Sequence, residues 1–136
     1  MTTPDQTGSS AKSLARRKAT YDAGVLAEAR TRVAIEADGW TILGQRLRTA
    51  AGEIDMVAEK DGLLAIIEVK SRPTLSQAAL ALTSRQRGRL TAACDILLSQ
   101  NPAWGCNGVR FDLIVTDAGG RVRRIADAFR LGDPTE

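Results

Sequence analysis

Two segments of the chain carry apolar residues at the spacing of an α-helix. The first covers residues 22–38 and ends at Gly39, a residue type that suits the left-handed position after a helix. Two stripes of this helix are candidates for its buried face, one with Leu26, Ala29, Val33 and Ala37 and the other with Glu28, Thr31 and Ile35, and the pattern does not choose between them. The second covers residues 84–99, where apolar residues recur at i, i+3, i+4, i+7 and i+8 and where Thr83 and Gln86 form a capping-box pattern. The pattern therefore predicts one helix near the start of the chain and another in its second half.

Five other segments have the alternating or continuous apolar character of β-strands. Three of them follow the first helix and two follow the second helix, the last two around the turn from Asp117 to Gly120. The run GLLAIIEV, residues 62–69, is apolar at consecutive positions, which is typical of a central strand buried on both faces. The order helix, three strands, helix, two strands predicts an α/β fold with a mixed β-sheet of about five strands flanked by helices.

These elements predict a single domain over residues 19–131. The polar start of the chain, residues 1–18, is predicted to be a disordered basic tail, and residues 132–136 a flexible C-terminus. No apolar run approaches the ~20 residues that a membrane span needs, so no membrane partner is expected.

The composition narrows the chemistry available to the protein. The chain has no histidine, which excludes a Ser-His-Asp triad, a histidine general base and any metal site built on imidazole. Lys and Arg number 19 against 16 Asp and Glu, and this mild excess suits an anionic partner without requiring one. Two cysteines are too few for a zinc cluster, and a reducing cytoplasm is the expected location. Catalysis, if present, would therefore use carboxylates and amines.

A hairpin in the middle of the chain predicts a pair of facing carboxylates. The dipeptide Asp61-Gly62 between two strand segments indicates a two-residue turn of type I′, which needs positive φ at both central residues. That turn places Asp55 directly opposite Glu68, with Cβ atoms about 4.5–5.5 Å apart. Two carboxylates at this distance repel each other, and Mg²⁺, which prefers oxygen ligands, would relieve the repulsion. The alternative is a slipped register or a longer loop that leaves both acids as surface charge.

The same register also predicts the position of Lys70 relative to this pair of carboxylates. Lys70 lies two residues after Glu68 and on the same strand face, directly opposite Glu53, so a cross-strand ion pair with Glu53 is the alternative to a role at the site. The two-residue period also predicts two faces for the preceding strand: Glu53, Asp55 and Val57 on one, and Ile54, Met56 and Ala58 on the other.

An Asp on one strand and Glu-x-Lys on the next, preceded by a Glu on an N-terminal helix, resemble the PD-(D/E)xK nuclease superfamily. The whole layout, from AEAR and DGWTIL through GEIDMVA, IIEVKSRP and TSRQRGRL to VRFDLIV and ADAF, resembles the YraN family of small bacterial proteins. That family is itself similar to archaeal Holliday-junction resolvases. The resemblance spans about Gly24 to Phe129 and implies a restriction-endonuclease-like fold and a metal-dependent endonuclease that hydrolyses DNA phosphodiester bonds, with branched or junction DNA among the expected substrates.

The resemblance also implies a role for each residue of the site. Asp55 and Glu68 match the metal-binding carboxylates, and the backbone carbonyl of Val69 matches the usual third protein ligand. Lys70 matches the lysine that orients or activates the attacking water, and Glu28 matches the helical acid that completes many such sites, although Glu28 taken alone would be interpreted as a solvated residue. The implied cofactor is Mg²⁺ or Mn²⁺, and related resolvases suggest a homodimer.

Arginines supply the expected contacts with DNA. Arg72 follows the Glu-x-Lys motif, and Arg85, Arg87 and Arg89 lie in the first turns of the second helix, where free backbone amides also favour anions. A solvated helix face is the alternative. Farther along the chain, Arg110 and Asp112 share a strand face and match the family's RFD; an internal ion pair and a site-facing role are the two interpretations, and the structural one is favoured.

Two other functions compete with the nuclease. One is a nucleic-acid-binding module of the same fold with little or no cleavage activity. The other is a scaffold subunit in which the acids are surface charge, which predicts that Asp55→Asn changes no activity. With two Trp, one Tyr and two Phe in the chain, a stacking platform for single strands is not evident.

Overall fold

The computed structural model describes the backbone of residues 4–129, and their side chains except those of residues 4–10, 20–23, 75, 78 and 79. A long helix, α1 (Pro4–Ala37), leads into three strands, β1 (Thr41–Thr49), β2 (Gly52–Lys60) and β3 (Leu63–Ser71). A short helix, α2 (Leu75–Leu80), and a longer one, α3 (Ser84–Gln100), connect β3 to β4 (Val109–Thr116) and β5 (Val122–Phe129). The predicted mixed α/β fold with five strands is confirmed, and α2 is the one addition to the predicted order.

The strands form one sheet in the order β1-β2-β3-β4-β5. All neighbours are antiparallel except β3 and β4, which run parallel and are joined through α2 and α3. A parallel pair needs a long crossover connection, and the two helices supply it. β3 is therefore the central strand, and Leu64, Ala65, Ile66 and Ile67 are at most 1% exposed, as the continuous apolar run predicts.

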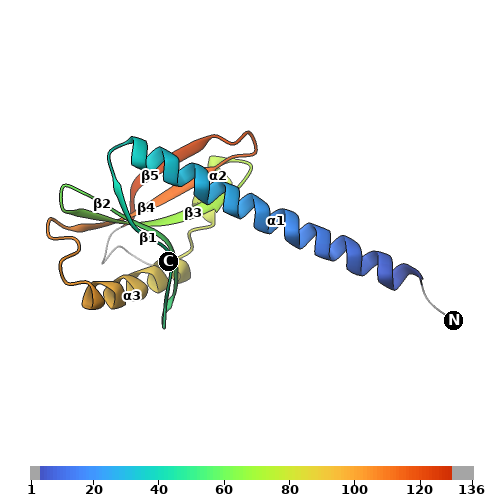
Figure 1. Ribbon diagram of the computed structural model, residues 1–136, viewed down its shortest axis with the longest axis horizontal. Helices are drawn as coiled ribbons and strands as arrows, with labels where there is room; N and C mark the ends of the chain where they lie inside the picture. Colours follow the sequence, from blue (N-terminus) through green and yellow to red (C-terminus); the bar gives the residue numbers. More distant parts are fainter. Residues whose placement is uncertain (1–3, 130–136) are drawn as a thin grey trace.

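Helices cover both faces of the sheet (Figure 1). On one face Ile35 of α1 packs with Trp40 and with alternate residues of β2, β3 and β4. On the other face Leu90 and Leu97 of α3 pack with Leu64 and Ile66. Thr83 caps α3, and its side chain accepts a 3.2 Å hydrogen bond from the backbone N–H of Gln86. Of the two stripes proposed for the first helix, the one that includes Thr31 and Ile35 is the buried one.

The β2–β3 hairpin has the predicted turn and register. Asp61 and Gly62 have φ values of 53° and 80°, both positive as type I′ requires, and Lys60 pairs with Leu63. The pairing continues to Met56 with Ile67, which confirms the register that places Asp55 beside Glu68.

One prediction about the faces of β2 is wrong. Ile54 packs in the cluster beneath α3 together with Val57, whereas Met56 packs in the cluster beneath α1. The alternation therefore changes phase at Asp55. The neighbouring strand is also irregular at this level, because Arg46 has a positive φ of 50°.

The start of the first helix also differs from the prediction. α1 begins at Pro4 rather than at Asp22, so residues 4–18, predicted to be disordered, are helical. Proline is suited to the first helical turn, and Ala, Leu, Lys and Arg, which are frequent in residues 11–19, have high helix propensity. Residues 1–3 and the predicted flexible C-terminus, residues 132–136, lie outside the described residues. No helix in the described part of the chain is long and apolar enough to cross a membrane.

Candidate functional site

The candidate site lies where the β2–β3 ladder ends. Beyond the pair Met56–Ile67, the Oδ2 atom of Asp55 accepts a 2.8 Å hydrogen bond from the backbone N–H of Val69. The N–H and C=O of a strand residue point to the same side, so the carbonyl of Val69 also points toward β2 at this level. Asp55 and Glu68 thus lie beside each other, as the hairpin register predicts, and the Val69 carbonyl faces the same strand.

Glu68 is the most unusual group of the site. It is 6% exposed, and its Oε2 atom has no hydrogen-bond partner among the described residues. The pKa of Glu68 is raised to about 7, mainly by burial and further by hydrogen bonding to Asp55 and by the charge of Asp55, against the opposing charges of Lys70 and Arg89. Glu68, placed beside Asp55, therefore favours a bound proton or a nearby cation over a second free negative charge.

Two cations lie beside Glu68. The Nζ atom of Lys70 is 3.6 Å from Oε1, and the Nη2 atom of Arg89 on α3 is 4.0 Å from Oε2. The alternative partner of Lys70, Glu53, instead pairs across β1–β2 with Arg48, whose Nε atom is 3.6 Å from Glu53 Oε2. Lys70 is therefore directed to the acidic pair, and its side chain is 14% exposed.

Glu28 has a different partner from the one its proposed role requires. Its Oε2 atom accepts a 2.8 Å hydrogen bond from Arg46 Nε on β1. The paired positions on either side place Arg46 across from Asp55, so Glu28 reaches the neighbourhood of the site through this arginine. Within the described residues, no group of three or more acidic or cysteine side chains is suited to holding a metal. The structure brings together Asp55 and Glu68, without Glu28 as a third acid.

The four arginines predicted to bind nucleic acid do not share one surface. Arg89 lies at the site, packed so closely over Gly52 that a Cβ atom there would be 2.8 Å from Arg89 Cδ. Arg85, one helical turn earlier, is exposed, and Arg72 is exposed with its Nη1 donating to the Ser71 carbonyl at 2.7 Å. Arg87 points elsewhere, because two residues along a helix turn the side chain by about 200°.

Arg87 lies over the ring of Phe129, with 6.0 Å between its Cζ atom and the ring centroid. Its Nε atom is buried without a hydrogen-bond partner among the described residues. Helical spacing predicts that Arg87 lies on a different side of α3 from Arg85 and Arg89. The sequence pattern alone does not predict which of the two sides faces the site.

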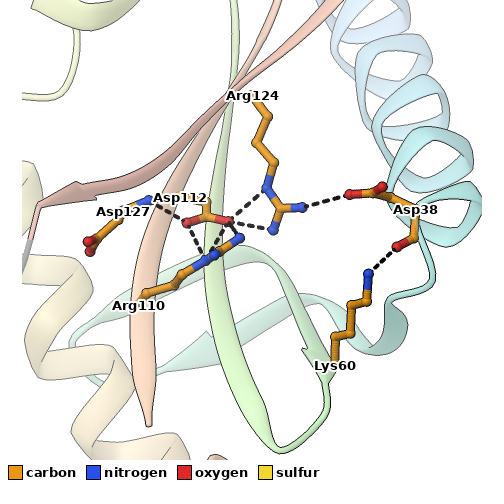
Figure 2. A network of polar contacts seen from close by, with 6 residues as sticks. All are labelled: Asp38, Lys60, Arg110, Asp112, Arg124 and Asp127. Carbon is orange, nitrogen blue, oxygen red and sulfur yellow. Dashed lines mark hydrogen bonds and ion pairs between the residues drawn. The ribbon is translucent and has the colours of Figure 1, made fainter.

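A second charged cluster lies on the α1 face of the sheet (Figure 2). The fully buried side chain of Asp112 accepts hydrogen bonds from Arg110 and Arg124, and its Oδ1 atom accepts one from the backbone N–H of Asp127 at 2.8 Å. Both guanidinium groups stack on Trp40, with Cζ atoms 4.9 Å and 4.5 Å from its ring. The interpretation of RFD as an internal ion pair is therefore confirmed, and the roles of Arg124 and Trp40 are additional.

This second cluster connects β4, β5 and the end of α1. Arg124 on β5 also lies 3.9 Å from Asp38 Oδ2, just after α1, and Lys60 on β2 donates to the Asp38 carbonyl at 2.8 Å. Asp112 thus joins β4 to β5 and to the end of α1, on the opposite face from Glu68.

The fold and the site define a small mixed α/β protein with a buried acidic pair flanked by Lys and Arg. The chain belongs to the uncharacterised protein family UPF0102, whose model matches residues 27–116, and this match confirms the resemblance to YraN-type proteins. The matched segment contains Asp55, Glu68, Lys70 and Arg89 and leaves out most of α1.

Sequence similarity to other members of this family extends over most of the chain. A UPF0102 protein of Granulibacter bethesdensis is 63% identical over 116 residues, which cover 85% of this chain and 73% of the relative. UPF0102 proteins of Acidiphilium cryptum and Azorhizobium caulinodans are 43% and 40% identical, over 90% and 85% of this chain and 94% and 88% of their own lengths.

Proposed function

We propose that this protein is a metal-dependent endonuclease that hydrolyses DNA phosphodiester bonds, with a restriction-endonuclease-like fold of the PD-(D/E)xK superfamily. The observation that carries the proposal is the buried Glu68 Oε2 atom, which lacks a hydrogen-bond partner among the described residues and lies beside Asp55. A buried carboxylate oxygen without a partner is destabilising unless a cation or proton occupies the position next to it.

The donor set fits a hard divalent cation. Two carboxylates and one backbone carbonyl offer oxygen ligands alone, and Mg²⁺ is usually bound by one or two carboxylates while it keeps several waters. Asp55, Glu68 and Val69 would hold the ion, and Asp55 is already oriented by the Val69 N–H. The ion would compete with the proton that the raised pKa of Glu68 favours in its absence.

Bound Mg²⁺ would supply a Lewis acid that polarises a phosphate oxygen and lowers the pKa of a water molecule. Lys70 would orient the attacking water and offset negative charge that develops on the phosphate. Arg89 would bind a phosphate oxygen of the substrate, because its guanidinium group is at the site and its side chain is 39% exposed. No residue of the chain forms a covalent intermediate in this account.

A binding module with little cleavage is the second candidate. It is favoured by the hydrogen bond between Glu28 and Arg46, which keeps the expected third acid out of the pair formed by Asp55 and Glu68. In this version Lys70 and Arg89 would bind phosphates without hydrolysis.

The experiment that separates the two candidates is an incubation of the full chain with end-labelled linear duplex, single-stranded, flap and four-way-junction DNA. Each substrate is tested with Mg²⁺, with Mn²⁺ and with EDTA. The nuclease predicts products that require metal and that identify the preferred substrate shape. Salt-sensitive binding without products in any metal would support the binding module and contradict the nuclease.

A further inference from the structure

The first half of α1 extends away from the rest of the protein (Figure 1). We call residues 4–19 the N-terminal arm. Every described side chain of the arm, from Ala11 to Ala19, is exposed. The packed part of α1 begins much later, with Ala27, Thr31 and Ile35 buried against the sheet.

A helix of this kind gains little stability from the protein's own core. Isolated helices shorter than about 12–15 residues are marginal in water, and most helices in proteins are stabilised by packing of an apolar face. Among residues 11–19 the one large apolar side chain is Leu14, and it is 60% exposed. Packing against the protein's own core therefore does little to hold the arm helical, and a bound partner would stabilise it.

The charges of the arm indicate the chemistry of that partner. Its cations are Lys12, Arg16, Arg17 and Lys18, and no Asp or Glu occurs from residue 6 to residue 21. Lys12 and Arg16 lie on one side of the helix, while Arg17 and Lys18 project about 100° and 200° farther around it. Cations therefore surround the arm without forming one charged stripe.

This distribution fits a polyanion better than a lipid surface. A membrane-surface helix combines a cationic face with a broad apolar face, and the described part of the arm has Leu14 but no such face. A helix that enters a groove of duplex DNA meets phosphates on both sides, and Lys and Arg directed around the helix neutralise both rows.

We propose that the N-terminal arm binds the phosphate backbone of duplex DNA, as a contact region separate from the site that contains Glu68. The proposal rests on the proposed function only in taking DNA as the partner. Residues 11–19 of the arm contain no carboxylate, so this part contributes to affinity and placement of the DNA and leaves the chemical step to the site.

The test measures DNA binding by the full chain in EDTA, by fluorescence anisotropy of a labelled duplex over a range of NaCl concentrations. Arg17→Ala/Lys18→Ala removes two charges of the arm and preserves helix propensity, because alanine is the best helix former. Arg121→Ala/Arg123→Ala is the matched control, since it removes two exposed arginines from the β4–β5 side of the domain. Hydrogen exchange of the amides of residues 11–19 is followed with and without DNA.

The proposal predicts that the arm variant lowers the slope of log affinity against log salt by about 1 to 2, because each neutralised phosphate contributes about 0.9. At low salt the arm variant should bind about tenfold or more weakly, whereas the control variant should keep the slope of the wild type. DNA should slow amide exchange in the arm.

An unchanged slope in the arm variant, or an arm protected by phosphatidylserine vesicles and not by DNA, would overturn the proposal. Because binding is measured without metal, its failure is distinct from a failure of the nuclease. A protein that binds through its arm but never cleaves would retain this inference and lose the nuclease.

Discussion

Asp55 on β2 accepts a 2.8 Å hydrogen bond from the backbone N–H of Val69 on β3, at the point where the ladder between the two strands ends. The side chain thus takes the place of a backbone carbonyl and completes the hydrogen bonding of β3. One oxygen of Asp55 is engaged in this way, and the carboxylate is fixed beside Glu68. Asp55 therefore has a structural role, as the acceptor for the Val69 N–H, and a proposed chemical role, as a metal ligand. Substitutions that keep or remove the hydrogen bond distinguish the two roles.

Asp55→Ala should be less stable than Asp55→Asn, whereas both variants should lose the same carboxylate ligand of the proposed metal site. The alanine leaves the Val69 N–H without its partner, which is expected to lower the free energy of unfolding by about 1–3 kcal/mol. Asparagine keeps an oxygen that accepts the same bond, so its effect on stability should be small. Urea unfolding at pH 6 measures both values, and equal destabilisation by the two variants would show that the hydrogen bond is not the cause.

Glu68 should make the protein less stable as the pH rises through 7. Because the folded-state pKa of about 7 lies above the ordinary value of 4.5, folding favours the protonated acid. The stabilising contribution is complete below about pH 4.5 and is lost as the pH increases past the folded pKa, with a total on the order of 3 kcal/mol.

Glu68→Gln is the matched variant for this prediction, because the amide does not titrate. In metal-free buffer the melting temperature of the wild type should fall from pH 5 to pH 8 relative to that of Glu68→Gln. Mg²⁺ should restore the wild type at pH 8 and have little effect on the variant. Parallel pH profiles for the two proteins would contradict the assigned ionisation.

Arg89→Ala should raise the pKa of Glu68 further. Arg89 lies 4.0 Å from Glu68 Oε2, and its positive charge favours the ionised acid. The pKa is measured from the side-chain carboxyl carbon shift of Glu68 in an NMR titration. Arg85→Ala, one helical turn away and without a described contact to Glu68, is the control and should leave the titration unchanged.

Asp112→Asn should destabilise the fold more than any substitution at the candidate site. Arg110 and Arg124 would lose the charge that neutralises them in a largely buried position, and such a loss is expected to lower the free energy of unfolding by about 3–5 kcal/mol. Asp38→Asn is the matched control, because the Asp38 side chain is 71% exposed and should contribute under about 1 kcal/mol. Comparable losses from the two variants in urea unfolding would contradict the structural role of Asp112.

Turn geometry and the apolar pattern of the sequence predicted the arrangement of β2 and β3 at the centre of the fold. The Asp61-Gly62 turn sets the register of β2 and β3, and the apolar run before Glu68 places β3 in the middle of the sheet. Both features depend on short-range geometry, so the positions of Asp55 and Glu68 followed from the sequence.

Features that depend on contacts between distant segments were not predictable in the same way. Arg46 lies across from Asp55 and binds Glu28, and no property of residues 28 or 46 alone indicates this pairing. The stacking of Arg124 on Trp40 likewise joins β5 to the segment after α1. The phase change at Asp55 lies across from the positive φ of Arg46 on β1, and strict strand alternation predicts neither feature.

Metal-dependent hydrolysis at the pair Asp55 and Glu68 is measured by single-turnover cleavage of the preferred DNA substrate in Mg²⁺ by the wild type, Asp55→Asn and Lys70→Ala. Arg121→Ala, on the exposed β4–β5 turn, serves as the control. The account predicts that both site variants lose at least about 100-fold in rate while the control keeps the rate of the wild type. Full metal-dependent cleavage by Asp55→Asn would contradict the assignment of Asp55 and Glu68 as the site of the chemistry.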